Sequence, residues 1–130
     1  MKWVISLIIL QEQTIAARLL QFISYLIAKN NKIIVQLDDF GAFGVKGSVV
    51  AQLLDVNRGL RINITQELLL EILQEDGQIL EMKLYIETGN DKFEIIVADG
   101  SIIDILGDGD RLPVAATGEY RDENLSYYKF

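Results

Sequence analysis

The chain has 130 residues, half of which are hydrophobic, and a formal net charge of −7. This length suits a single small domain with its own core, and the excess of acidic residues argues against binding to a nucleic-acid phosphate backbone. Cysteine and histidine are both absent, which excludes disulfides, thiolate nucleophiles and cysteine-based metal sites and removes the commonest general base. We therefore expect no cofactor, no bound metal and no nucleic-acid partner.

The N-terminal residues 1–10 place one lysine before an apolar run, as a signal peptide does. No small-x-small cleavage site follows, and the run is too short to cross a bilayer, which needs about 20 residues. Residues 3–10 are therefore predicted to form a buried first strand. We expect a soluble, cytoplasmic protein that does not bind membranes.

A first helix is predicted to follow this strand. The hydroxyl of Thr14 suits an N-cap, and Asn30-Asn31 ends the apolar pattern. The apolar residues between these points recur at helical spacing on one face. They are Ile15, Leu19, Phe22, Ile23, Leu26 and Ile27.

Further elements are predicted up to residue 75, from alternating apolar residues and from serine or threonine caps. Together with the first strand and the first helix, the elements follow in the order β-α-β-β-α-β-α, in which the crossovers place the helices on one face of a sheet. The expected fold class is therefore α+β, an open-faced β-sandwich over residues 1–75. The elements after the first helix are strands over 32–38, roughly 42–46 and 60–64, and helices that begin near Ser48 and after Thr65.

Residues 76–130 have a different pattern. Strict alternation of apolar and polar residues over 79–98 predicts a β-hairpin. Residues 101–106 form either a strand or a single helical turn, 107–110 a loop, and 117–130 a polar, aromatic tail that is a docking peptide or an edge strand. We expect a mainly β extension that covers the first domain, extends its sheet or swaps between chains.

Two short motifs carry a family resemblance. The first helix opens with Thr14-Ile15-Ala16-Ala17-Arg18-Leu19-Leu20, and the second with Lys46-Gly47-Ser48-Val49-Val50. With the order of elements over 3–75, these motifs resemble the HPr phosphocarriers of the sugar phosphotransferase system. The corresponding family motifs are Gly-aliphatic-His-small-Arg-Pro-small and Lys-Ser followed by two large apolar residues. Ile15, Ala17 and Arg18 fit the first motif, and the resemblance implies an HPr-like fold that docks other proteins.

The departures from the family motif decide the expected chemistry. The resemblance aligns Ala16 with the histidine that carries the phosphoryl group in the family. Alanine offers no nucleophile, and no histidine elsewhere in the chain can replace it. Leu19 and Leu20 add bulk where the family has proline and a small residue. We therefore expect a non-catalytic binding or regulatory module, and not a histidine phosphocarrier.

Two residues of these motifs are candidate sites. Arg18 could bind an anion at the N-terminus of the first helix, where free amides and the helix dipole favour negative charge. Alternatively, it is a solvated arginine of the first turn. The resemblance makes Ser48 a candidate for regulatory phosphorylation. The alternative is an ordinary N-cap, which Gly47 favours because it separates Ser48 from the preceding lysine.

An apolar patch between the two helix starts is the expected docking surface. Val49, Val50, Leu53 and the following leucine cannot all face inward on a short helix, and Leu20 lies off the main face of the first helix. Such a patch would meet a protein partner. Alternatively, residues 76–130 partly bury it.

Acidic residues suggest two further interpretations. Asp104, Asp108 and Asp110 lack the spacing of an EF-hand calcium loop, so we interpret them as part of a polar turn. A carboxylate-only enzyme is one alternative function, and the small domain without an evident cleft argues against it. The other alternative is an assembly protein, in which the hairpin 79–98 offers a sheet edge to a second copy in a homodimer.

Overall fold

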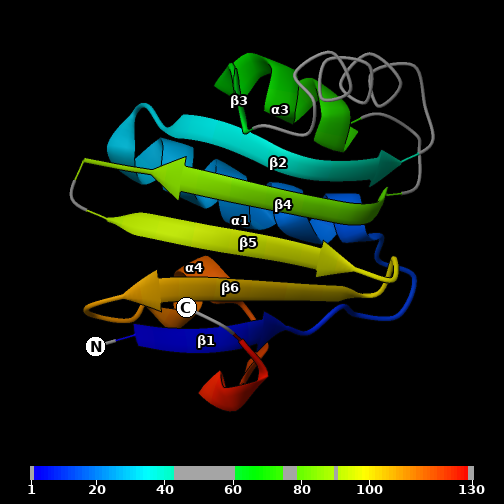
Figure 1. Cartoon of the computed structure of the whole chain (residues 1–130), viewed down its shortest axis with the longest axis vertical. Helices are drawn as coiled ribbons and strands as arrows, with labels where there is room; N and C mark the ends of the chain where they lie inside the picture. Colours follow the sequence, from blue (N-terminus) through cyan, green and yellow to red (C-terminus); the bar gives the residue numbers. More distant parts are fainter. Residues whose placement is uncertain (1, 43–60, 75–78, 90, 129–130) are drawn as a thin grey trace.

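One antiparallel sheet with helices packed on one of its faces forms the fold. The computed structural model describes residues 2–42, 61–74, 79–89 and 91–128 (Figure 1). Within this part of the chain, the predicted α+β class is confirmed by two main helices and a seven-stranded sheet. The elements are β1 (Lys2–Leu7), α1 (Ile15–Asn30), β2 (Ile34–Ala42), β3 (Ile62–Ile64), α3 (Gln66–Gln74), β4 (Ile79–Glu87), β5 (Lys92–Ala98), β6 (Ile102–Asp108), α4 (Val114–Thr117), β7 (Tyr120–Asp122) and the 3₁₀ turn η1 (Leu125–Tyr127).

The strand order joins the two halves of the chain. It is β3-β2-β4-β5-β6-β1-β7, and every neighbouring pair is antiparallel. β1 and β2, which α1 connects, are therefore parallel to each other and separated by β4, β5 and β6. Residues 76–130 supply these three strands and the edge strand β7. The regions predicted as a domain over 1–75 and an extension over 76–130 thus share one sheet.

The hairpin predicted over 79–98 is confirmed as β4 and β5, but it lies inside the sheet. β4 pairs with β2 and β5, and β5 pairs with β4 and β6. Both edges of the hairpin are occupied, one by β2, which is distant in sequence, and the other by β6, which follows β5 along the chain. The expectation that this hairpin offers a free edge to a second copy is therefore wrong.

The first helix and the third predicted helix lie where the sequence placed them, as α1 and α3. The predicted strand 60–64 is observed as β3. The strand expected at 42–46 and the helix expected from Ser48 lie outside the described residues, apart from Ala42, which ends β2. Residues 120–122 pair with β1 as β7, which confirms the edge-strand interpretation for this part of the tail.

The loop predicted at 107–110 begins two residues too early, because β6 continues to Asp108. Gly107 belongs to β6, where it pairs with Trp3 on one side and Phe93 on the other. A Cβ at Gly107 would lie less than 3.0 Å from carbons of the Trp3 indole. The glycine that suggested a loop instead leaves space for the indole against the strand.

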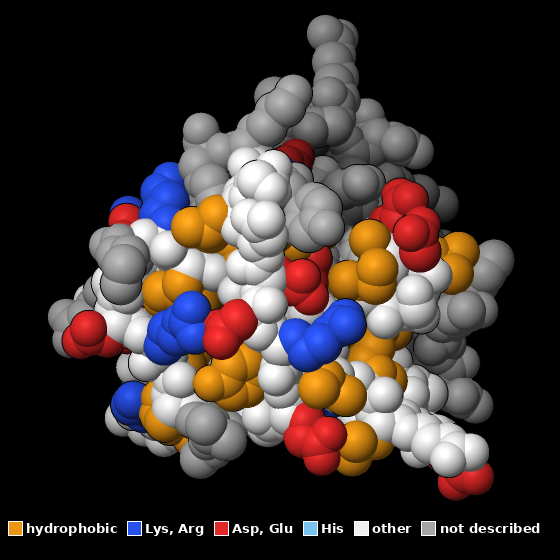
Figure 2. Space-filling view, turned by 90° about the horizontal axis from the view of Figure 1, so that it is seen from below, with side chains coloured by type: hydrophobic (Ala, Val, Ile, Leu, Met, Phe, Trp, Pro, Cys, Tyr) orange, Lys and Arg blue, Asp and Glu red, His pale blue; other side chains and the backbone are white. Residues whose placement is uncertain are grey.

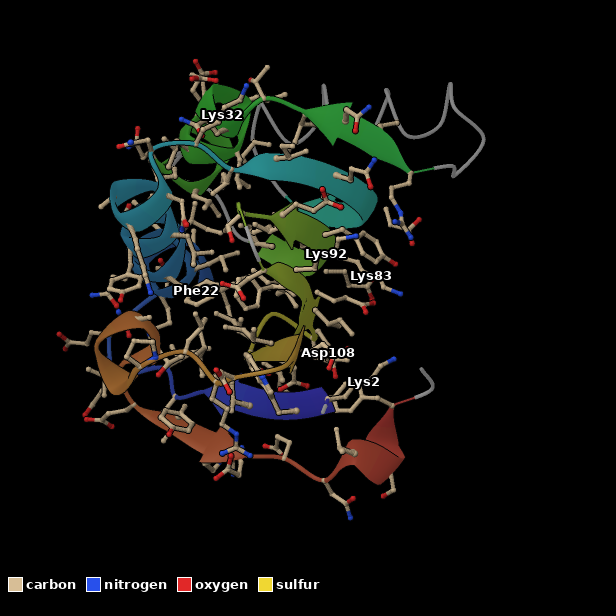
Figure 3. All side chains as sticks on the ribbon, turned by 90° about the vertical axis from the view of Figure 1, so that its left-hand side faces the viewer. Lys2, Phe22, Lys32, Lys83, Lys92 and Asp108 are labelled. Atoms are coloured by element: carbon tan, nitrogen blue, oxygen red, sulfur yellow. The ribbon has the colours of Figure 1, made fainter. Side chains whose placement is uncertain are left out.

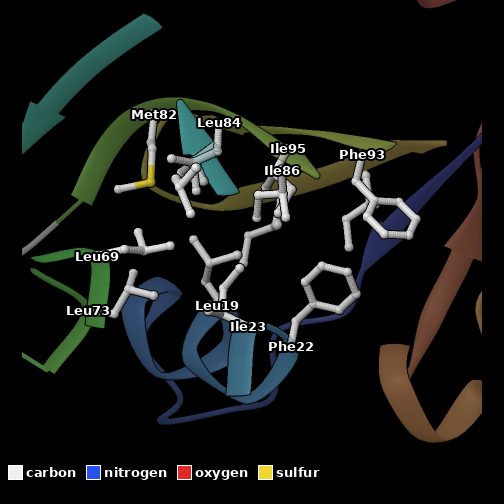
Figure 4. Packing of buried hydrophobic residues seen from close by; sticks show 14 of the residues in the cluster. Leu19, Phe22, Ile23, Leu69, Leu73, Met82, Leu84, Ile86, Phe93 and Ile95 are labelled. Atoms are coloured by element: carbon white, nitrogen blue, oxygen red, sulfur yellow. The ribbon is translucent and has the colours of Figure 1, made fainter. Parts of the chain in front are cut away.

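The core lies between α1, α3 and one face of the sheet. α1 buries the predicted apolar face, including Leu19 and Phe22, against the inward residues of β4, β5 and β6 (Figure 4). The Phe22 ring meets Phe93 edge-on, with centroids 6.4 Å apart, a favoured aromatic geometry. Leu69 and Leu73 bring α3 onto the same core.

The opposite side of the sheet, which we call the open face, carries the alternate residue of each strand. Lys83, Lys92, Lys2 and Asp108 extend from this side, whereas Phe22 lies between α1 and the sheet (Figure 3). In the part of the chain that the structure describes, no helix is long and apolar enough to cross a membrane.

Candidate functional site

The start of α1 is the region that the family resemblance singles out. The Thr14 hydroxyl accepts a hydrogen bond from the Ala17 amide at 3.0 Å, which confirms the predicted N-cap. Ala16 is buried, with 5% of its surface exposed. It lines a cavity of about 500 Å³ together with Thr14, Ile79 and Ser101. A methyl group therefore stands where the resemblance places the histidine, on the inner side of the helix.

Arg18 is also buried, with 4% of its surface exposed, so the solvated alternative is wrong. Its Nε donates to the carbonyl of Ile8 at 3.0 Å, and its Nη2 donates to the carbonyls of Thr117 and Glu119. Burial lowers the pKa of Arg18, and the Glu119 carboxylate opposes this shift. The guanidinium joins α1 to the segment after β1, to the end of α4 and to the residues that follow α4, and these contacts leave the anion-binding interpretation without geometric support.

A sequence signal for the burial of Arg18 exists. The residue lies three positions after Ile15 and four before Phe22, so it falls within the apolar face of α1. A charged residue within such a face needs buried partners. Its partners are the carbonyls of residues 8, 117 and 119, and no pattern within α1 reveals them.

The predicted docking patch and phosphorylation site are placed only in part. Leu20 is half-buried and packs against the edge of the core. Ser48, Val49, Val50 and Leu53 lie outside the described residues. The patch and the modification of Ser48 therefore stay predictions.

The aspartates that suggested a calcium loop have separate surroundings. Asp104 lies on β6, and its Oδ2 accepts a hydrogen bond from the Tyr128 hydroxyl. Asp108 ends β6, and its pKa is lowered by a hydrogen bond from the N-terminal amino group and by the charges of that group and Lys2. Among the described residues, no three acidic side chains are grouped to hold a metal ion.

An aromatic and charged cluster on the open face was not predicted. The Arg61 guanidinium lies 3.5 Å from the centroid of the Tyr85 ring, within the range of a cation–π interaction. The Tyr85 hydroxyl donates to Asp38 Oδ2 at 3.4 Å. Lys83 forms an ion pair with Glu94 at 3.2 Å. Hydrogen bonding with Tyr85, followed by that with Glu94, raises the pKa of Lys83 against the opposing effect of burial.

Two shallow depressions flank Tyr85, and we call them together the Tyr85 groove. One, of about 280 Å³, extends toward β6 and β1 and is lined by Leu106 and Asp108 among others. The other, of about 230 Å³, extends toward β2 and is lined by Ile34 and Arg61 among others. Tyr85, Lys92 and Phe93 line both depressions. The groove depends on the pairing of β2 with both β3 and β4, which brings residues 34–36, 61 and 85 together.

Charged residues alternate along one rim of this groove. Glu87 pairs in register with Lys92 across β4 and β5, and Asp108 pairs with Lys2 across β6 and β1. Lys92 lies 3.5 Å from Glu87. Seen from the side of β1 and η1, the described surface mixes acidic, basic and hydrophobic side chains without a continuous patch of one kind (Figure 2).

No protein-family model, no curated protein and no solved structure matches this chain.

Proposed function

We propose that the chain is a non-catalytic module that docks a partner protein at the Tyr85 groove. The stacking of Arg61 on Tyr85, between two depressions on the open face, is the observation that supports this proposal most directly. Tyrosine and arginine are strongly enriched among residues that dominate binding energies in protein interfaces. Here the stacking restrains both side chains before a partner arrives, so less conformational entropy is lost on docking.

The electrostatics of the groove favour binding over catalysis. A general acid or base works best with a pKa near the operating pH. The pKa of Asp108, which lines the groove, is lowered and the pKa of Lys83, beside Tyr85 on the same face, is raised, so both shifts lead away from neutrality. Lys83 and Lys92 are also held in ion pairs with Glu94 and Glu87. These groups stay charged and serve recognition.

The relationship to the HPr family is part of the same proposal. It is supported by the order of β1, α1, β2, β3 and α3 along the chain and by Ile15, Ala17 and Arg18 at the start of α1. Under this relationship, the sequence-predicted patch of Leu20, Val49, Val50 and Leu53 is a second docking surface. Because the chain has no histidine, the proposed module regulates or recruits its partner without carrying a phosphoryl group on histidine.

The test begins with the full chain as bait. A captured protein is identified by mass spectrometry, purified and titrated against the chain by calorimetry. Tyr85→Ala and Arg61→Ala should each weaken binding by about tenfold or more. Tyr25→Ala is the matched control, because Tyr25 is half-buried on α1, on the other side of the sheet, and should leave the affinity unchanged.

The double variant Val50→Asp, Leu53→Asp tests the second surface. Weakening by this variant alone would move the docking site from the groove to the predicted helix patch. Unchanged affinity in all variants would refute both surfaces. If the captured protein is the chain itself, the assembly alternative replaces the binding module.

A further inference from the structure

The C-terminal residues turn from β7 onto the open face, and we call residues 123–128 the strap. The Glu123 amide donates to the Val4 carbonyl at 3.1 Å. The Asn124 side chain accepts from the Ser126 amide at 2.9 Å and so caps η1. The Tyr128 hydroxyl then donates to Asp104 Oδ2 on β6. The strap accordingly lies beside β1 on the side of the sheet opposite α1 (Figure 3), and its Tyr128 reaches β6.

The strap lies over the most deeply buried part of the open face. Val4, Ser6 and Leu106 are 1%, 4% and 5% exposed. They alternate along β1 and β6 with residues of the core, so their side chains belong to the open face. On the same face Tyr85 is half-buried, and Ile34 is 54% exposed. The strap is held at this buried part of the face by the hydrogen bonds to the Val4 carbonyl and to Asp104.

The buried residues continue the Tyr85 groove. Tyr85, Glu94, Leu106 and Val4 are successive register neighbours across β4, β5, β6 and β1. Leu106 also lines the depression of about 280 Å³ beside Tyr85. Without the strap, the Tyr85 groove would therefore continue across β6 to β1.

We propose that the strap is an autoinhibitory segment that closes the β6–β1 end of the Tyr85 groove, and that its release exposes Leu106 and Val4 to the partner. This inference rests on the proposed function, because it concerns the regulation of the same groove. Asp104 Oδ1 is buried without a hydrogen-bond partner among the described residues. A buried polar atom of this kind penalises the closed arrangement and so favours release of the strap.

Single cysteines test the closure directly, because the chain has none of its own. Val4→Cys reports on cover by the strap, and Val35→Cys is the matched control, since Val35 is 1% exposed in the core beneath the helices. The rate of thiol labelling by a maleimide is measured in each, with Tyr128 intact and with Tyr128→Phe. Removing the hydrogen bond to a carboxylate should speed labelling at position 4 by about tenfold and leave position 35 unchanged.

Three outcomes would overturn the inference. They are labelling at position 4 that is already fast with Tyr128 intact, labelling that Tyr128→Phe does not accelerate, and acceleration that is equal at positions 4 and 35. Tyr25→Phe, the same substitution on α1, should change neither rate.

Partner titration separates the two proposals. Tyr128→Phe should tighten binding of the identified partner by about the factor seen in labelling. Faster labelling with unchanged affinity would refute autoinhibition. If Tyr85→Ala does not weaken binding of the partner, the groove is refuted as the docking site, whatever the labelling shows.

Discussion

Replacing Arg18 by methionine should destabilise the fold and loosen its β7 edge first. The methionine side chain keeps the apolar packing of the arginine stem but cannot donate to the carbonyls of Ile8, Thr117 and Glu119. A buried carbonyl that loses its donor costs about 1–3 kcal/mol. The substitution also removes the cost of burying a cation. With three carbonyls affected and that cost relieved, we expect a loss of about 3 kcal/mol.

Arg18→Lys separates charge from geometry. Lysine retains the positive charge, but its single ammonium group cannot replace the fork of donors that reaches three carbonyls. We expect a loss between that of methionine and the native chain, at about 1–2 kcal/mol. A loss as large as that of Arg18→Met would show that the number of donors, and not the charge, stabilises this region.

The assay is urea unfolding followed by tryptophan fluorescence and, separately, amide hydrogen exchange. Lys32→Met, at an exposed lysine, is the control and should change stability by no more than about 0.5 kcal/mol. Exchange should increase first in β7 and at Ile8, whose amide donates to the Glu119 carbonyl at 2.8 Å. A loss below about 1 kcal/mol for Arg18→Met, with unchanged exchange in β7, would refute the role assigned to the guanidinium.

Three further substitutions test local parts of the fold. Gly107→Ala should cost about 1–3 kcal/mol and alter the near-ultraviolet circular dichroism of Trp3, because the added methyl overlaps the indole; Gly89→Ala, with nothing within 4 Å of its added Cβ, should be nearly neutral. Thr14→Ala should lower the free energy of unfolding by about 1 kcal/mol through loss of the N-cap. The urea midpoint should fall accordingly, and an unchanged midpoint would contradict this prediction. Burial and a neighbouring carboxylate raise the pKa of Tyr128, so the folded chain retains a proton that the unfolded chain loses above about pH 10. Stability should therefore fall as the pH rises above about 10, and by less in Tyr128→Phe.

Local patterns were sufficient for the elements whose signals lie within a few residues. The Thr14 cap and the apolar face from Ile15 to Leu26 predict α1 correctly, because capping and helical periodicity depend on near neighbours. The alternation over 79–98 predicts β4 and β5 for the same reason. Gly107 was misassigned, because the ring that requires a glycine there belongs to Trp3, more than a hundred positions earlier.

The candidate sites show the same difference between signals from near neighbours and contacts between residues distant in sequence. The motif at the start of α1 drew attention to Arg18, but neither sequence interpretation predicted its burial, since two of its three partner carbonyls lie about a hundred residues further along the chain. The Tyr85 groove was not predicted. The alternating patterns place Arg61 and Tyr85 on the solvent-facing sides of two strands, and nothing in either pattern indicates that the two side chains meet. They meet because β2 pairs with both β3 and β4.

The sequence alone determined the α+β class, the helix α1, the β4–β5 hairpin and the absence of histidine and cysteine chemistry. Each of these follows from composition or from contacts between residues close along the chain. Tertiary structure decided the strand order, the burial of Arg18, the Tyr85 groove and the strap across the open face. These features arise where strands and side chains distant in sequence pair, and alternation within one strand specifies which face is buried but not which strand lies beside it.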